Sequence, residues 1–145
     1  MNNVKNLFHK ISYAQYPFML IALVYALMPY FQGFSVFWTC INQALIFAGL
    51  GISFSTLQDT SKTQNEVSRK IWESPKKGRR ALIFIAVSAL LMLVSGLYGF
   101  LLAKDGIVKE VAFGMLMLGI GYIGLLKSAI EMFENHRSDR TAQSS

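Results

Sequence analysis

The stretch QDTSKTQNEVSRKIWESPKKGRR, residues Gln58–Arg80, lies between long apolar segments and decides how the rest of the chain is interpreted. It holds seven of the chain's 14 lysines and arginines and only three acidic residues. Positive charge concentrated in a short loop between apolar spans is typical of the cytoplasmic side of a membrane protein. We therefore expect residues 58–80 to form a basic cytoplasmic hairpin.

Charged residues are scarce elsewhere in the chain. They make up 15% of the 145 residues, against about 25% in an average soluble domain. Residues 11–58 contain no formal charge over 48 consecutive positions. A transmembrane helix needs roughly 20 predominantly apolar residues, so this run is long enough for two helices and a tight turn. The composition indicates one all-α integral membrane domain over residues 1–145.

Four apolar segments are each long enough to span a membrane. Their approximate bounds are 13–31, 34–57, 81–103 and 111–130. They predict a four-transmembrane-helix bundle with a polar C-terminal tail at 132–145. Pro29 and Gly33 are expected to form the first turn. The polar residues after the second span are expected to continue its helix until Ser74 and Pro75 end it and begin the next.

The distribution of positive charge predicts the orientation of these spans. If both termini are cytoplasmic, twelve of the 14 lysines and arginines lie inside, and only Lys104 and Lys109 lie outside. We therefore expect a multi-pass protein of the bacterial inner (plasma) membrane with both termini in the cytoplasm. Four residues form a cytoplasmic basic surface expected to attract anionic lipid headgroups: Lys76, Lys77, Arg79 and Arg80. Because the basic residues flank the membrane, the net charge of +6 does not indicate a nucleic-acid partner.

Small residues recur at helical spacing in the later spans. Close approach of helix backbones over small residues drives association in lipid, where hydrophobic drive between helices is weak. Gly114 and Gly121 are seven residues apart in the fourth span, Gly124 falls beside them, and Gly96 lies in a similar row of the third span. We predict that the third and fourth spans pack closely together through these rows.

The second span carries small residues on two faces. Gly49 shares one face with Asn42, and Gly51 lies on the nearly opposite face. A helix with two such faces is expected to touch two neighbours and to be central to the bundle. Asn42 is accordingly assigned to the bundle interior.

The neighbouring carboxamide, Gln43, lies on a third, bulky side of the second span together with Phe47 and Phe54. Two alternatives are open for it. This face meets another subunit or a partner protein and Gln43 hydrogen-bonds across the contact, or Gln43 bonds its own backbone or the first span within the monomer.

The sequence contains only weak matches to nucleotide-binding and metal-binding motifs. The run GIGYIG at 119–124 matches the dinucleotide fingerprint, but that fingerprint requires a strand before it and a helix opening after it, and this run lies within a span. Glu131, Glu134 and His136 lack the spacing of a di-metal site in a helical bundle, and Cys40 has no partner. We predict no enzyme activity, no cofactor and no metal.

The leading functional hypothesis is a small structural, assembly or regulatory subunit without catalytic activity. Its partners would be the lipid bilayer and either a second copy of the chain or another membrane protein. The alternative is a small oligomeric transporter or channel. Its path would be lined by Asn42, Ser53, Thr56, Ser88 and Ser95. A proton or ion relay would need acidic residues inside the bilayer, and the interiors of the predicted spans contain none.

Overall fold

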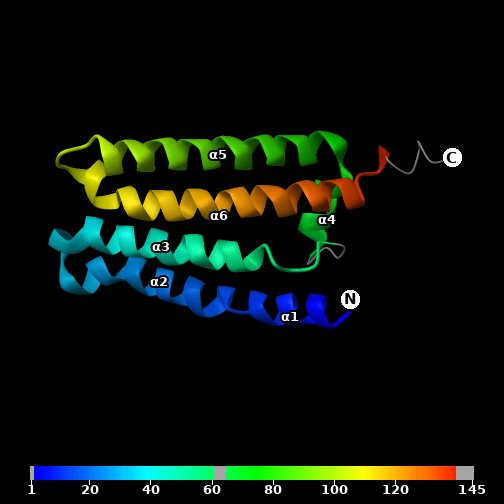
Figure 1. Ribbon diagram of the computed structural model, residues 1–145, viewed down its shortest axis with the longest axis horizontal. Helices are drawn as coiled ribbons and strands as arrows, with labels where there is room; N and C mark the ends of the chain where they lie inside the picture. The colour runs from blue at the N-terminus through cyan, green and yellow to red at the C-terminus, as the bar shows by residue number, and fades with distance from the viewer. Residues whose placement is uncertain (1, 61–64, 140–145) are drawn as a thin grey trace.

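The computed structural model describes residues 2–60 and 65–139 (Figure 1). Within these two ranges the regular elements are all helical, and no strand is present. Their bounds are α1 (Asn2–Ser12), α2 (Gln15–Gln32), the 3-10 helix η1 (Phe34–Val36), α3 (Phe37–Ser55), α4 (Glu66–Glu73), α5 (Pro75–Leu101) and α6 (Ile107–His136). Four helical stretches in the described ranges are long and apolar enough to cross a membrane. The prediction of an all-α chain with four candidate spans is therefore confirmed.

The four long helices lie side by side in one layer, in the order α2, α3, α6, α5 (Figure 1). Each adjacent pair in this row packs along its length, whereas α2 and α5 form the two edges. The two middle helices, α3 and α6, therefore have two neighbours each. The two small faces of the second span predict this for α3, but no sequence signal predicted it for α6.

The layer consists of two helical hairpins, α2–α3 and α5–α6. Both turns contain a glycine with a φ of 95°, Gly33 and Gly106, a backbone conformation that only glycine adopts readily. Pro29 was expected in the first turn but lies inside α2, and its carbonyl accepts a hydrogen bond from the Gly33 N–H at 2.9 Å. Proline removes the bond that its own nitrogen would donate and crowds the preceding turn, but the N–H groups that follow it can still bond, and α2 continues to Gln32.

The two ends of the layer carry different segments of the chain. We call the end that carries Gly33 and Gly106 the turn end. We call the opposite end, which carries α4 and both described chain ends, the α4 end (Figure 1). At the α4 end, α6 continues to His136 and α5 begins at Pro75, so both helices are longer than the spans that hydropathy suggested.

The helix of the second span stops at Ser55 instead of continuing through the polar hairpin. Hydroxyl groups in its last turns donate to nearby carbonyls, Ser55 Oγ to Ile52 at 2.6 Å and Thr56 Oγ1 to Ser53 at 2.7 Å. Such local bonds compete with further helix growth. A separate helix, α4, begins after Asn65, whose side chain caps the Ser68 N–H at 2.8 Å.

The break before α5 follows the expected pattern. Ser74 is the N-cap residue and Pro75 is the first helical residue. The side chain of Ser74 accepts a hydrogen bond from the Lys77 N–H at 3.5 Å. Proline suits this position because its fixed φ is helical and its missing N–H would have no partner there.

The buried apolar positions are occupied mainly by small side chains. Most are alanines or a cysteine within the spans: Ala22, Cys40, Ala44, Ala89, Ala112 and Ala129. Large apolar side chains point outward, and Phe84 in α5, for example, is 70% exposed. In water this much exposed apolar surface would be unfavourable, but lipid tails cover it without cost. The arrangement indicates a multi-pass membrane protein.

Candidate functional site

A close contact seam joins α3 and α6, with residues 72 positions apart facing each other. The Gly114 N–H donates to Asn42 Oδ1 at 2.7 Å. Seven residues further on, Gly121 lies against the backbone of Gly49, where an added Cβ would come within 2.7 Å of the Gly49 carbonyl oxygen. Asn42 therefore lies between helices and bonds the backbone of α6.

The seam continues to the α4 end with the same spacing. Ser128 Oγ donates to the Thr56 carbonyl at 3.1 Å, which provides a partner for a carbonyl at the end of α3. Gly124 lies next to the Thr56 side chain, 3.2 Å from where a Cβ would stand. Contacts that repeat every seven residues on both helices are characteristic of parallel helices that keep one register over several turns.

The glycine row of the fourth span faces a different neighbour from the one we expected. Gly114, Gly121 and Gly124 pack against α3 and not against α5. The α5–α6 contact uses another side of α6, where Leu116 lies against Gly96, and a Cβ on Gly96 would stand 2.8 Å from Leu116 Cγ. Periodicity identifies the residues that share a face, but it does not identify the helix that the face meets.

The other side of α3 packs against α2. A Cβ added at Gly51 would lie 2.8 Å from Met19 Sδ. Aromatic rings fill the rest of this contact, with Phe47 stacked on Tyr25 at 5.7 Å and Phe54 stacked on Phe18 at 5.3 Å between ring centroids.

The aromatic contact between α2 and α3 lies on the face of α3 to which Gln43 was assigned. On the bulky face that Gln43 shares with Phe47 and Phe54, these two aromatic rings pack against α2 of the same chain. Gln43 itself is half-buried and makes no side-chain hydrogen bond to another described residue.

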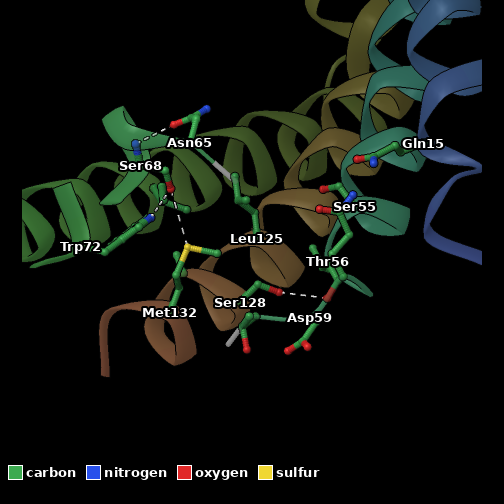
Figure 2. A pocket seen from close by; sticks show the side chains of 14 residues that line it. Gln15, Ser55, Thr56, Asp59, Asn65, Ser68, Trp72, Leu125, Ser128 and Met132 are labelled. Atoms are coloured by element: carbon green, nitrogen blue, oxygen red, sulfur yellow. Dashed lines mark hydrogen bonds between the residues drawn. The ribbon is translucent and has the colours of Figure 1, made fainter. Parts of the chain in front are cut away.

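A cavity of about 390 Å³ lies at the α4 end, between the end of α3, α4, α5 and α6 (Figure 2). The helix α4 is held over it by a short chain of contacts. The indole N–H of Trp72 donates to Ser68 Oγ at 3.0 Å, and Ser68 Oγ lies 3.8 Å from Met132 Sδ of α6. Sequence reasoning missed this cavity because it depends on the fold-back of α4.

The lining of this cavity is rich in hydroxyl and amide groups. Among the described lining residues, Asp59 is the one carboxylate, and none is a lysine, histidine or cysteine. Such a lining can hydrogen-bond a polar molecule. The described residues also contain no group of three or more His, Cys, Asp or Glu side chains that could hold a metal ion.

The predicted basic surface lies in the first turns of α5. Its four side chains are exposed and make no ion pair with a described residue: Lys76, Lys77, Arg79 and Arg80. Gly78, in the middle of this run, is buried beneath the ring of Phe133, and an added Cβ would collide with that ring. Sequence reasoning missed Gly78 because it counted the run KKGRR only for its charge.

The basic surface and the polar cavity thus lie at the same end of the layer. Four positive side chains and the partial positive charge of the α5 N-terminus have the same sign there. Residues of the predicted alternative path are separated, because α6 lies between α3 and α5. Comparison of the chain with protein-family models, curated proteins and solved structures found no match.

Proposed function

We propose that the protein is a noncatalytic subunit of the bacterial inner membrane, with a structural, assembly or regulatory role toward another membrane protein. The observation that supports this proposal is the single layer of four helices (Figure 1). A row of helices presents a large apolar surface to a partner in the membrane. A transport path would instead need helices, from one chain or from several copies in an oligomer, that close around it.

The alternative, a transporter or channel, is less consistent with the positions of its polar residues. Asn42 is engaged with the Gly114 N–H, and Ser53 Oγ donates to the Gly49 carbonyl at 2.8 Å. Ser88 and Ser95 lie on α5, on the far side of α6. A path lined by all of these residues would require helices that the layer keeps apart.

Partner recovery and flux measurements test the proposal together. The full chain, tagged at its C-terminus, would be purified from native membranes in a mild detergent. We expect a defined membrane protein to copurify at constant stoichiometry. Sealed vesicles that contain only this chain should show the same ion and solute flux as empty vesicles. Flux above that background, with no copurifying partner, would overturn the proposal in favour of transport.

We further propose that the α4 end faces the cytoplasm. The positive charge concentrated at that end supports this orientation. Reporter fusions after Gly33 and Gly106 should then report outside, and fusions after Gln64 and Arg140 should report inside. An inside result after Gly33 would contradict both the orientation and the first hairpin.

We propose that the basic surface of α5 contacts anionic lipid headgroups. Residues 81–101 of α5 extend about 31 Å at 1.5 Å per residue, which matches the roughly 30 Å hydrocarbon core. The turns that carry the basic residues then lie at headgroup level. Each basic residue contributes about 1 kcal/mol near an anionic leaflet.

Neutralisation tests this contact. Replacing the four basic residues together with glutamine should weaken orientation, partner recovery or retention of anionic lipid. The matched control is Lys104→Gln, an exposed lysine at the turn end, which should behave as wild type. If the fourfold variant keeps the topology, lipid retention and partner yield of wild type, the basic surface is not a contact site.

A further inference from the structure

A second groove at the α4 end, of about 640 Å³, lies between α1, the segment that follows α3, and the last turns of α6. Its charged lining carries both signs and comes from three parts of the chain. The four charged side chains are Lys5, Asp59, Lys127 and Glu131. We propose that this groove binds the headgroup of a zwitterionic phospholipid that has a phosphate and a primary ammonium, as in ethanolamine phospholipids.

The balance of charge favours a zwitterion over an anion. Two ammonium groups in the groove attract a phosphate, but an anionic headgroup would also face the carboxylates of Asp59 and Glu131. A ligand with both charges can place its phosphate near the lysines and its ammonium near the carboxylates. His9 also lines the groove and contacts the Tyr13 hydroxyl at 3.3 Å through Nε2. It supplies one more polar contact.

The ion pair already present does not prevent binding. Lys127 Nζ lies 3.3 Å from Glu131 Oε1, and these side chains are 79% and 46% exposed. Exposed pairs of this kind contribute little to stability. Glu131 Oε2 also accepts a hydrogen bond from Thr60 Oγ1 at 3.4 Å, which it can keep while Oε1 turns to the ammonium. Lys127 can then turn to the phosphate, which converts one ion pair into two.

The surroundings of the groove favour a lipid over a soluble molecule. Phe8 and Leu57 line it beside the charged groups. Phe8 belongs to an apolar stripe on α1 that is exposed in the described structure: Val4, Leu7, Phe8 and Ile11. In Figure 1, α1 continues the direction of α2, so its apolar stripe lies where the first span leaves the layer and can face acyl chains next to the groove. The groove opens where α3 ends, at the level expected for headgroups if the layer spans the bilayer.

Lipid retention measured on the purified full chain tests this proposal independently of partner recovery or flux. The probes are ethanolamine, choline and glycerol phospholipids with identical acyl chains, and the readout is the bound fraction by native mass spectrometry. The choline headgroup keeps both charges but cannot donate hydrogen bonds to the carboxylates. We expect the ethanolamine lipid to be retained about tenfold better than the choline lipid, because charge-assisted hydrogen bonds would be lost.

Variants assign the preference to the groove. Glu131→Gln should remove the preference for ethanolamine over choline, and Lys127→Gln should weaken retention of all three lipids. Lys104→Gln and Asp105→Asn, exposed charges at the turn end, are the matched controls and should retain lipid as wild type does. The thermal midpoint of each variant in lipid-free detergent verifies that folding is intact.

Three results would overturn the proposal. Equal retention of the three lipids by the wild-type chain would mean that the protein does not distinguish between their headgroups. A preference unchanged in Glu131→Gln would mean that the groove is not the site of the discrimination. Soluble phosphoethanolamine that stabilises the protein as strongly as the lipid does would assign the site to a free zwitterion instead of a membrane lipid.

Discussion

The two sides of α3 differ in how they hold a neighbouring helix. On the α6 side, glycines bring two backbones together, and a side-chain amide reaches a backbone N–H. On the α2 side, side chains make the contact: aromatic rings stack, and Gly51 lies against the side chain of Met19. The α3–α6 contact therefore depends on glycines that let the backbones touch, whereas the α2–α3 contact is made by side chains. The backbone contact should tolerate substitution far less, because a backbone cannot turn aside as a ring can.

The largest effect is expected from Gly121→Leu. The new side chain would stand where the Gly49 carbonyl lies, so α3 and α6 must separate. Overpacking usually costs about 1–3 kcal/mol and occasionally more, and we expect the upper part of that range. Unfolding of the variant in mixed detergent micelles measures the change.

A pair of alanine variants sharpens this prediction. Gly121→Ala still meets a carbonyl oxygen, whereas Gly124→Ala meets the Thr56 side chain at 3.2 Å. The first should destabilise the protein clearly more than the second. Equal effects of the two would mean that backbone proximity does not determine the strength of the seam.

A smaller effect is expected on the aromatic side. Phe47→Leu keeps an apolar side chain but removes the stacking of Phe47 with Phe18 and Tyr25, at 6.2 and 5.7 Å. Each aromatic pair contributes about 0.5–1.5 kcal/mol beyond burial, so two pairs contribute about 1–3 kcal/mol, and we expect the lower part of that range. Phe84→Leu, on an exposed position of α5, is the control. If it lowers stability as much as Phe47→Leu does, the rings do not hold α2.

The polar bond of the α6 side should contribute less than either contact. Asn42→Leu removes the acceptor of the Gly114 N–H. Hydrogen bonds between membrane helices average about 0.6 kcal/mol, so the free energy of unfolding should fall by roughly that amount. The same micelle titration measures it. A loss near that of Gly121→Leu would show that the amide, and not the glycines, dominates the seam.

The smallest effect is expected from Gln43→Leu. Because α2 covers the neighbouring aromatic side chains, we expect unchanged crosslinking between chains and nearly unchanged stability. The intersubunit role that the sequence suggested for Gln43 predicts the opposite result. A clear shift in the crosslinked fraction would restore that role and would mean that α2 leaves part of this face open.

The sequence predicted those structural features that a single residue or a short run of residues determines locally. The long apolar runs, the glycine turn at Gly33 and the new helix at Ser74 and Pro75 follow from backbone chemistry that acts within a few residues. Gly49 and Gly51 were correctly separated onto two faces of one helix, because helical period alone determines this.

Features that depend on distant segments could not be predicted. The face of α6 that contains Gly121 meets α3 and not α5, because the row order brings together helices that are far apart in the chain. The burial of Gly78 under Phe133 and the cavity beneath α4 depend on a fold-back that has no periodic signal. Local hydroxyl bonds also ended α3 at Ser55, although the following residues are compatible with a helix.

The row order has a consequence for how the chain assembles. Each hairpin forms its main contact between helices that are consecutive spans, so both can form locally as the spans enter the membrane in pairs. The α3–α6 contact then joins two finished halves, and it closes a loop that includes α4 and α5. A chain divided between α3 and α4 would therefore yield two fragments that each insert alone, and their reassociation would measure the strength of a single helix interface.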